Sequence, residues 1–245
     1  MYGQKDSISS PNKWFDKTIA QKKINVSLRG GVAFNSFTND ITTIWDGNMN
    51  QVTSPGWIVG LHFDCPILTS FNFQVGINWR NKGFKLSETT ADYKHEIKAK
   101  ANFIDVPILF AYKHRIKNFL EFEVAAGPYV SFGLGSGTVK DLVTYYKEPG
   151  DESLTPGWIN QEHRQSKKHT EDVYAFFGDN LDESLGMRNL DVGLTFAAGI
   201  SVNRFYVGFR YDLGLRDMSN KYCWSEDIKF LTRSPSIIIG LDFWK

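Results

Sequence analysis

Residues 71–80 read Phe71-Asn72-Phe73-Gln74-Val75-Gly76-Ile77-Asn78-Trp79-Arg80, and this stretch decides the fold. Aromatic and branched side chains occupy every odd position, and polar or small side chains occupy every even position. Successive side chains of a β-strand point to opposite faces, so the alternation predicts a strand with one lipid-like face and one polar face. Such strands are typical of membrane β-barrels, whose apolar rows face outward and whose polar rows face the lumen.

The same alternation recurs in seven further segments of the chain. The eight predicted strands are 24–34, 57–65, 71–80, 104–112, 120–132, 190–202, 205–213 and 237–243. Eight strands make the smallest common closed barrel. The sequence therefore predicts an all-β fold, an eight-stranded antiparallel up-and-down transmembrane β-barrel.

The connections between these strands alternate in length. Those at 66–70, 113–118 and 203–204 are short, whereas those after the first, third, fifth and seventh strands are long. This asymmetry is expected when short turns face the periplasm and long loops face outside. We expect a periplasmic extension over 1–22, a barrel domain over 23–245, and a long third extracellular loop at about 134–187.

Aromatic residues at the ends of the predicted strands suit girdles at two membrane interfaces. They are Trp57, Phe63, Phe71, Trp79, Tyr112, Phe132, Phe205, Tyr211 and Phe243.

The composition neither requires nor excludes a membrane. The 245 residues include 28 basic and 27 acidic side chains, and this balance gives no argument for binding nucleic acid. A mean hydropathy of −0.31 would suit a soluble protein, but polar lumen residues dilute every hydropathy window in a barrel. Residues 1–21 contain no apolar signal segment, so we expect that a secretory signal has been removed. The expected location is the bacterial outer membrane, with its lipid as a partner.

Five stretches carry a resemblance to a known family. They read PGWIVGL at 55–61, FIDVPIL at 103–109, AAGPYV at 125–130, LDVGL at 190–194 and FRYDLGL at 209–215. These stretches resemble the PorT-like, "porin family" small outer-membrane β-barrels of Gram-negative bacteria. The resemblance implies an eight-stranded barrel in the outer membrane without catalytic residues, and some members of that family serve type IX secretion. The chain departs from the family pattern in its long third loop and in ending Phe243-Trp244-Lys245.

The row expected to face the lumen contains many ionisable residues. They are Arg29, His62, Asp64, Arg80, Asp105, Glu121, Glu123, Asp191, Arg210 and Asp212. The interior of an eight-stranded barrel is only wide enough to be filled by side chains, so we interpret this set as a network of ion pairs and hydrogen bonds. Two alternatives are a narrow ion or proton path and an acid/base dyad of Asp105 and Glu121, although Arg80 favours neutralisation of such a dyad.

The third long loop is rich in aromatic residues. It contains Tyr145, Tyr146, Trp158, Tyr174, Phe176 and Phe177. These side chains could form a contact surface for a partner protein, a glycan or a membrane component. Alternatively, they fold the loop onto itself or onto the mouth of the barrel, and the sequence favours neither reading.

Three other motifs predict no chemistry. The stretch Gly133-Leu134-Gly135-Ser136-Gly137 lacks phosphate-loop spacing, so we expect a flexible exit from the fifth strand. Cys65 and Cys223 are expected at opposite ends of the barrel and unpaired. His163 and His169 do not match metal-ligand spacing, and neither a metal nor another cofactor is predicted.

The leading functional hypothesis is a non-enzymatic outer-membrane barrel that binds or scaffolds through its extracellular loops, within a larger outer-membrane or secretion complex. The rivals are an outer-membrane enzyme with catalytic groups at the loop rim, a narrow channel, and a soluble ligand-binding barrel of lipocalin type. The lipocalin reading needs the apolar rows to face inward and the charged rows to face outward. The direction in which the two rows point therefore separates it from a membrane barrel.

Overall fold

The computed structural model describes residues 24–38, 50–90, 93–117, 119–145, 168–178, 184–220 and 229–243. Its strands are β1 (Asn25–Phe37), β2 (Asn50–Val52), β3 (Ser54–Pro66), β4 (Phe71–Thr89), β5 (Tyr93–Lys117), β6 (Leu120–Tyr145), β7 (Lys168–Phe177), β8 (Ser184–Met187), β9 (Leu190–Val202), β10 (Phe205–Gly214) and β11 (Thr232–Asp242). The expected extension over 1–22 lies outside these residues, and so do Tyr146, Trp158, His163 and Cys223. Cys65 is a free cysteine. Within the described ranges, no helix is long and apolar enough to cross a membrane.

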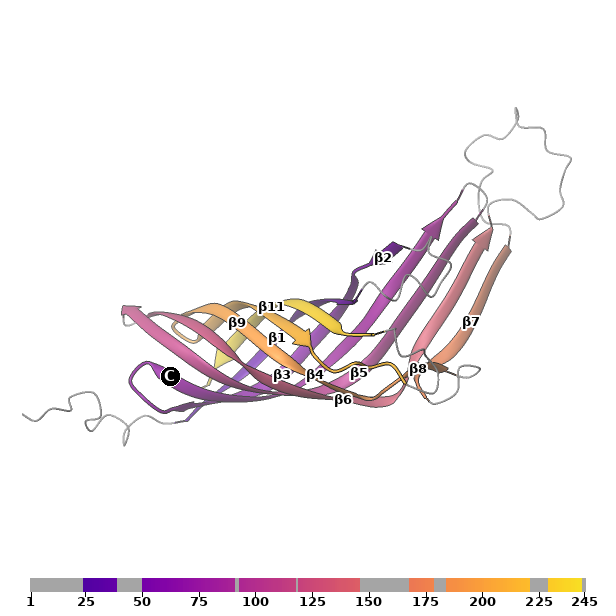
Figure 1. Cartoon of the computed structure of the whole chain (residues 1–245). Helices are drawn as coiled ribbons and strands as arrows, with labels where there is room; N and C mark the ends of the chain where they lie inside the picture. Colours follow the sequence, from indigo (N-terminus) through magenta and orange to yellow (C-terminus); the bar gives the residue numbers. More distant parts are fainter. Residues whose placement is uncertain are drawn as a thin grey trace, which may run out of the picture.

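Eight of the strands close into a ring, which Figure 1 shows from the side. The antiparallel order is β1, β3, β4, β5, β6, β9, β10 and β11, and β11 pairs back onto β1. At the closure, Leu28 lies opposite Leu61 on one side and Leu241 on the other, so apolar residues face the same way across three strands. The prediction of an eight-stranded antiparallel barrel is confirmed.

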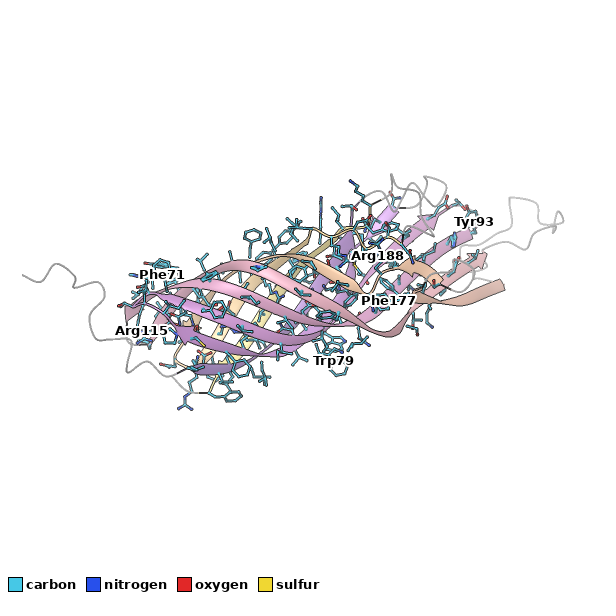
Figure 2. All side chains as sticks on the ribbon, turned by 60° about the horizontal axis from the view of Figure 1, so that its bottom comes forward. Phe71, Trp79, Tyr93, Arg115, Phe177 and Arg188 are labelled. Carbon is cyan, nitrogen blue, oxygen red and sulfur yellow. The ribbon has the colours of Figure 1, made fainter. Side chains whose placement is uncertain are left out.

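The two rows of each strand point as the alternation predicts. On β4, Ile77 and Trp79 are about half exposed on the outer surface, whereas Asn78 and Arg80 are almost fully buried inside. Figure 2 shows a dense layer of such side chains around the outside of the barrel, with Phe71 and Trp79 toward opposite ends. A surface this apolar is stable only against lipid, and this arrangement contradicts the lipocalin reading.

The short turns lie where the sequence places them. The β3–β4, β5–β6 and β9–β10 connections are all at one end of the barrel. In the two-residue β9–β10 turn, Asn203 has a φ of 54°, a left-handed conformation that asparagine tolerates better than most residues and that tight hairpins require.

The strands at the opposite end are much longer than predicted. β4, β5 and β6 continue beyond the barrel to Thr89, Tyr93 and Tyr145. There β2 pairs with β4, β7 pairs with β6, and β8 pairs with β7. We call this extension the projecting sheet; it comprises residues 81–89, 93–103 and 134–145 together with β2, β7 and β8, and it leans away from the ring in Figure 1. The connection expected over about 134–187 thus contains strands at 134–145, 168–177 and 184–187, which the sequence analysis did not predict.

A bulge in β6 marks where the projecting sheet leaves the ring. Below it, β6 pairs with β9 as far as Phe132 and Leu190, and above it β6 pairs with β7 from Val139 onward. Gly135 and Gly137 both have a φ of 67°, and the pairing with β5 slips at this level. The glycine-rich stretch is thus a defined bend in a continuous strand, and the expectation of a flexible exit is corrected.

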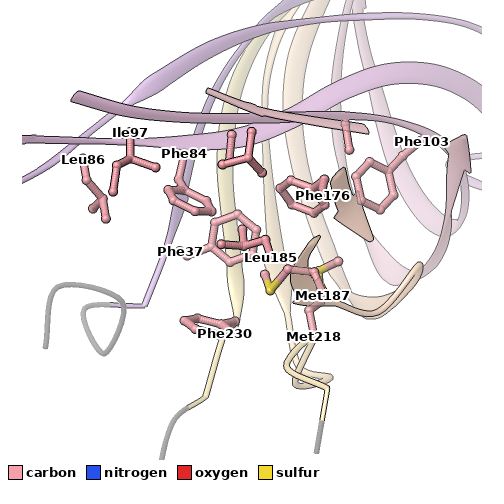
Figure 3. Packing of buried hydrophobic residues seen from close by; sticks show 13 residues of the cluster. Phe37, Phe84, Leu86, Ile97, Phe103, Phe176, Leu185, Met187, Met218 and Phe230 are labelled. Atoms are coloured by element: carbon pink, nitrogen blue, oxygen red, sulfur yellow. The ribbon is translucent and has the colours of Figure 1, made fainter. Parts of the chain in front are cut away.

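The projecting sheet has its own apolar core (Figure 3). The buried members are Phe37, Phe84, Leu86, Ile97, Ala99, Ala101, Phe103, Val139, Phe176, Leu185, Met187, Met218 and Phe230. The face of β4–β6 that is polar inside the barrel becomes apolar here, as Arg80 and Lys82 are followed by Phe84 and Leu86. Side chains from outside these strands cover this apolar face, so the projecting sheet is a folded module.

Candidate functional site

All ten ionisable residues assigned to the lumen row are buried inside the barrel. Their exposed fractions are Arg29 8%, His62 7%, Asp64 6%, Arg80 0%, Asp105 0%, Glu121 8%, Glu123 2%, Asp191 0%, Arg210 4% and Asp212 1%. Buried charges are stable only when they are paired and hydrogen-bonded, and the structure pairs them in successive layers along the barrel.

Arg80 organises the layer nearest the middle of β4. Its Nη1 donates a hydrogen bond to Asp105 Oδ2 at 3.0 Å and a second one to Asp212. Asp212 also accepts hydrogen bonds from Thr195 Oγ1 at 2.6 Å and from Arg210 Nε at 2.9 Å. One guanidinium thus joins carboxylates from β5 and β10 across the lumen.

Lys82 and Asp191 form the layer nearest the projecting sheet. Lys82 Nζ lies 2.9 Å from Asp191 Oδ2 and 3.4 Å from Asp105 Oδ1. The same Asp191 oxygen accepts hydrogen bonds from Tyr129 at 3.0 Å and Thr232 at 2.9 Å. The sequence analysis missed Lys82 because the predicted strand ended at residue 80, although Lys82 continues the inward row of Asn78 and Arg80.

Lys113 organises the layer at the short-turn end. Its Nζ donates a hydrogen bond to Asp64 Oδ2 and lies 3.0 Å from Glu123 Oε2. Glu121 pairs with Arg115 at 3.0 Å in the same layer. Lys113 had been placed in a turn, but it continues the inward row of Leu109 and Ala111 on β5.

A small cavity of about 20 Å³ lies inside the barrel, beside Arg29 and His62. Arg29 Nη1 lies 3.3 Å from Glu123 Oε1, and its guanidinium stacks 3.8 Å from the Tyr206 ring centroid. His62 Nε2 lies 2.9 Å from Asn78 Oδ1, so the amide oxygen accepts a hydrogen bond from the ring. The cavity is lined by Arg29, Ile58, His62, Gln74, Asn78, Leu109, Glu123, Ala197, Tyr206, Arg210 and Ile238. Its volume is enough for about one or two water molecules.

This arrangement closes the lumen rather than forming an acid/base pair. Asp105 is held by Arg80 and Lys82, whereas Glu121 is held by Arg115 in a different layer. The structure therefore does not bring Asp105 and Glu121 together as a dyad. In the described part of the chain, no three His, Cys, Asp or Glu side chains are grouped so as to hold a metal ion.

The structure describes the side chains of only some of the aromatic residues that the sequence analysis placed in the third long loop. Phe176 is fully buried in the apolar core, and its ring centroid lies 4.9 Å from that of the partly buried Phe177. The two rings also contact Phe84 of β4 and Phe103 of β5, so the assignment to a contact surface is corrected for the fully buried Phe176. Tyr145 and Tyr174 belong to β6 and β7, and their side chains lie outside the described part.

The outer face of the projecting sheet carries a cluster of charges that the sequence analysis did not identify. The Glu96 carboxylate lies 2.7 Å from Lys85 Nζ, 2.9 Å from Lys98 Nζ and 3.1 Å from Lys94 Nζ. Burial raises the pKa of Glu96, but hydrogen bonds from Lys85, Lys98 and Lys94 outweigh this effect and lower it to about 2. The signal in the sequence is the alternation of Glu96, Lys98 and Lys100 with Ile97, Ala99 and Ala101 on β5.

The enzyme hypothesis would gain support if His163 or His169 lay within hydrogen-bond reach of a loop carboxylate and a serine. His95 Nε2 lies 2.6 Å from Asp141 Oδ1 in the projecting sheet, a pair that the sequence analysis did not identify. His163 and the side chain of His169 lie outside the described residues.

One protein family and several solved structures are similar to this chain. The sequence model of the family described as outer membrane protein β-barrel domain matches residues 9–220. Among solved structures, Ail, the attachment invasion locus protein of Yersinia pestis, is 11% identical, with a TM-score of 0.36, over 91% of this chain and 100% of that chain. Neisserial surface protein A is 9% identical, with a TM-score of 0.39, over 90% and 97% of the two chains. OprG from Pseudomonas aeruginosa is 11% identical, with a TM-score of 0.34, over 91% and 98%.

No curated protein matches the sequence. The family match, however, spans most of the chain and covers seven of the eight ring strands, from β1 to β10. With an apolar outer surface and a charged, filled lumen, this protein belongs to the outer membrane protein β-barrel domain family and is located in the bacterial outer membrane.

Proposed function

We propose that this protein is a non-enzymatic binding or scaffolding component of the outer membrane that acts through its extracellular side. The observation that carries the proposal is the projecting sheet, which stands on its own apolar core above a lumen filled with ion pairs. A barrel that served only to cross the membrane would not need such a module.

The interior of the barrel argues against a transport function. Arg80, Asp105 and Asp212 join strands on different sides of the lumen, and all three are almost fully buried. A conducting path would have to separate these pairs, which costs about 3–5 kcal/mol for each partner lost. We therefore expect no steady conductance from the protein in a planar bilayer.

The projecting sheet favours binding because it is rigid and extends well beyond the ring. Its core fixes β4, β5 and β6 to β7, and Tyr145 of β6 lies directly opposite Lys168 of β7 at its far end. A rigid platform reduces the entropy that is lost when a partner binds. Tyr145, Tyr146, Trp158 and Tyr174 stay candidates for the contact itself.

The resemblance to PorT-like barrels supports a finer proposal. A barrel with a closed lumen and a folded extracellular module suits a fixed component of a larger outer-membrane or secretion complex. In that setting, the membrane domain anchors the module and the module recognises a protein partner.

The pairing of Tyr145 with Lys168 gives a direct test. Residues 146–167 can be replaced by Asn-Gly, because a two-residue turn connects directly paired antiparallel strands. The matched control changes the short turn at the other end, Asn203-Arg204, to Asp-Gly. Both variants and the unaltered protein would be purified from native outer membranes in mild detergent after crosslinking, and the partners identified by mass spectrometry.

A partner that is lost only when residues 146–167 are replaced would support the proposal. A barrel without partners in all three samples would contradict it and would redirect attention to the enzyme reading. A partner kept in the loop variant but lost in the turn variant would place the binding on the periplasmic side and would also contradict it.

A further inference from the structure

The cavity inside the barrel is lined by a surplus of hydrogen-bond donors. Within the part of the chain that the structure describes, three N–H groups of its lining have no hydrogen-bond partner: Arg29 Nε, Asn78 Nδ2 and Arg210 Nη2. The three residues are only 8%, 1% and 4% exposed. A buried donor without an acceptor is costly, because it has given up its hydrogen bond to water. The cavity therefore favours a ligand that accepts hydrogen bonds.

The other polar atoms of these three side chains hold the donors in place. Arg29 Nη1 lies 3.3 Å from Glu123 Oε1, and Arg210 Nε donates a hydrogen bond to Asp212 Oδ1 at 2.9 Å. The amide oxygen of Asn78 accepts a hydrogen bond from the neighbouring imidazole ring at 2.9 Å. The donors thus come from β1, β4 and β10, and a ligand that meets such fixed groups orders few additional side chains when it binds.

The charges around the cavity favour an anion. Two arginines and one glutamate line it, so its formal charge is +1 when histidine is counted as neutral. The Glu123 carboxylate already accepts hydrogen bonds from Arg29 and from Gln74 at 3.0 Å, and it lies 3.0 Å from Lys113 Nζ. Arg210 Nη2 is 3.8 Å from the nearest carboxylate oxygen of Asp105, which is too far for a hydrogen bond.

The size of the cavity limits which anion can enter. Its volume is about 20 Å³, and one water molecule needs about 10–15 Å³ of such space, so sulfate, phosphate and carboxylates are too large. A water molecule would fit, but it would also have to donate hydrogen bonds of its own. Among the described residues of the lining, no buried side-chain acceptor lacks a partner. A halide ion accepts hydrogen bonds from all three N–H groups and donates none.

We propose that this cavity binds a single chloride ion, held by Arg29 Nε, Asn78 Nδ2 and Arg210 Nη2. The ion joins three strands of the ring from the inside and so stabilises the closed lumen. It is a fixed ligand of the barrel and not a transported ion. This inference concerns the interior of the barrel and is independent of the proposed function.

The first test measures the urea unfolding of the full-length protein in detergent micelles, in mixtures of sodium chloride and sodium gluconate at constant ionic strength. Ala197→Val narrows the cavity without changing a charge, because Ala197 belongs to its lining. Ala125→Val is the matched control, because Ala125 lies directly opposite Ala197 on β6 and does not line the cavity. Asn78→Asp replaces an N–H donor by a negatively charged acceptor.

The chloride site exists only when the three strands are assembled, so chloride should bind the folded state alone. Above the Kd, an approximately tenfold rise in free chloride should then lower the unfolding equilibrium constant of the unaltered protein by about tenfold. A125V should respond in the same way, whereas A197V and N78D should lose most of the response. A response that is absent from the unaltered protein, retained by A197V or N78D, or lost equally in A125V would overturn the proposal.

The second test locates the ion directly. Crystals of the unaltered protein grown in sodium bromide should show an anomalous difference peak within hydrogen-bonding distance of Arg29 Nε, Asn78 Nδ2 and Arg210 Nη2, because bromide replaces chloride and scatters anomalously. Water density in the cavity without an anomalous peak would overturn the proposal, even if chloride stabilised the protein in solution.

Discussion

Lys82 Nζ lies 2.9 Å from the Asp191 carboxylate at the boundary between the polar lumen and the apolar core. The same ammonium group is 5.0 Å from the Phe103 ring centroid, and Lys82 is only 2% exposed. Each charge of the pair therefore depends on the other, because neither has access to bulk water. Lys82 thus links the two folded parts of the protein.

Replacing this lysine should destabilise the whole protein. Lys82→Met leaves Asp191 buried without its cationic partner and weakens the neutralisation of Asp105, so we expect a loss of about 3–5 kcal/mol in the free energy of unfolding. Adding Asp191→Asn should restore much of that loss. Urea titration in detergent micelles measures both values, and a double variant as unstable as the single one would contradict this account.

The bulge in β6 gives a prediction with a built-in control. At Gly137, an added Cβ would lie 2.5 Å from the Cβ of Phe176 and 2.9 Å from that of Ala101, whereas at Gly135 nothing lies within 4 Å. Both glycines have a φ of 67°. Gly135→Ala should therefore cost only the left-handed strain, about 1–2 kcal/mol, and Gly137→Ala about 2–4 kcal/mol. Equal losses in the two unfolding titrations would show that Phe176 does not pack there.

The stability of the projecting sheet should depend on pH through Glu96. Its pKa falls from 4.5 to about 2 on folding, so the ionised carboxylate stabilises the folded state fully above pH 4.5. This contribution is lost as the pH falls through about 2. Glu96→Gln should lower the urea unfolding midpoint at pH 6, and the gap from the unaltered protein should narrow between pH 4.5 and pH 2. A gap that stays constant over this range would contradict the ion pairs with the lysines.

The position of the membrane can be tested with single arginines. Val124 is 60% exposed on the outer surface of β6 within the barrel, and Ser87 faces outward on β4 in the projecting sheet. Val124→Arg should cost about 2–4 kcal/mol in lipid vesicles, whereas Ser87→Arg should cost about 0–1 kcal/mol. Similar costs at both positions, measured by unfolding from vesicles, would show that the two sites share one environment.

The sequence predicts the barrel because the outward and inward rows of each strand differ so clearly within the membrane. Residues such as Ile77 and Arg80 have no alternative: a shift of one residue would place charge in lipid and apolar groups in the polar network. The ten lumen residues were found for the same reason. Their specific partners, for example Arg80 with Asp212, depend on how the ring closes across the lumen, and alternation along one strand does not contain that information.

The sequence analysis did not predict the projecting sheet because apolar residues face inward and charged residues face outward there, the reverse of the arrangement in the barrel. Phe84 and Leu86 continue the inward row of Arg80, and Lys85 continues the outward row of Trp79. Outward lysines within 94–100 are also typical of a solvated loop, and the apolar cover comes from Phe176, Met218 and other distant residues. Only the tertiary structure brings that cover into place.

The level at which polar and apolar residues change faces along the strands also determines the thickness of bilayer that the barrel fits. On β4 the outer face becomes polar after Trp79 and the inner face becomes apolar after Lys82, while the hydrogen-bonded register runs on unchanged. Moving the exchange by two residues on each strand would shift the hydrocarbon boundary by roughly 5 Å at the usual strand rise and tilt. Substitutions at alternate positions could therefore adapt this protein to membranes of different thickness without changing a single strand pairing.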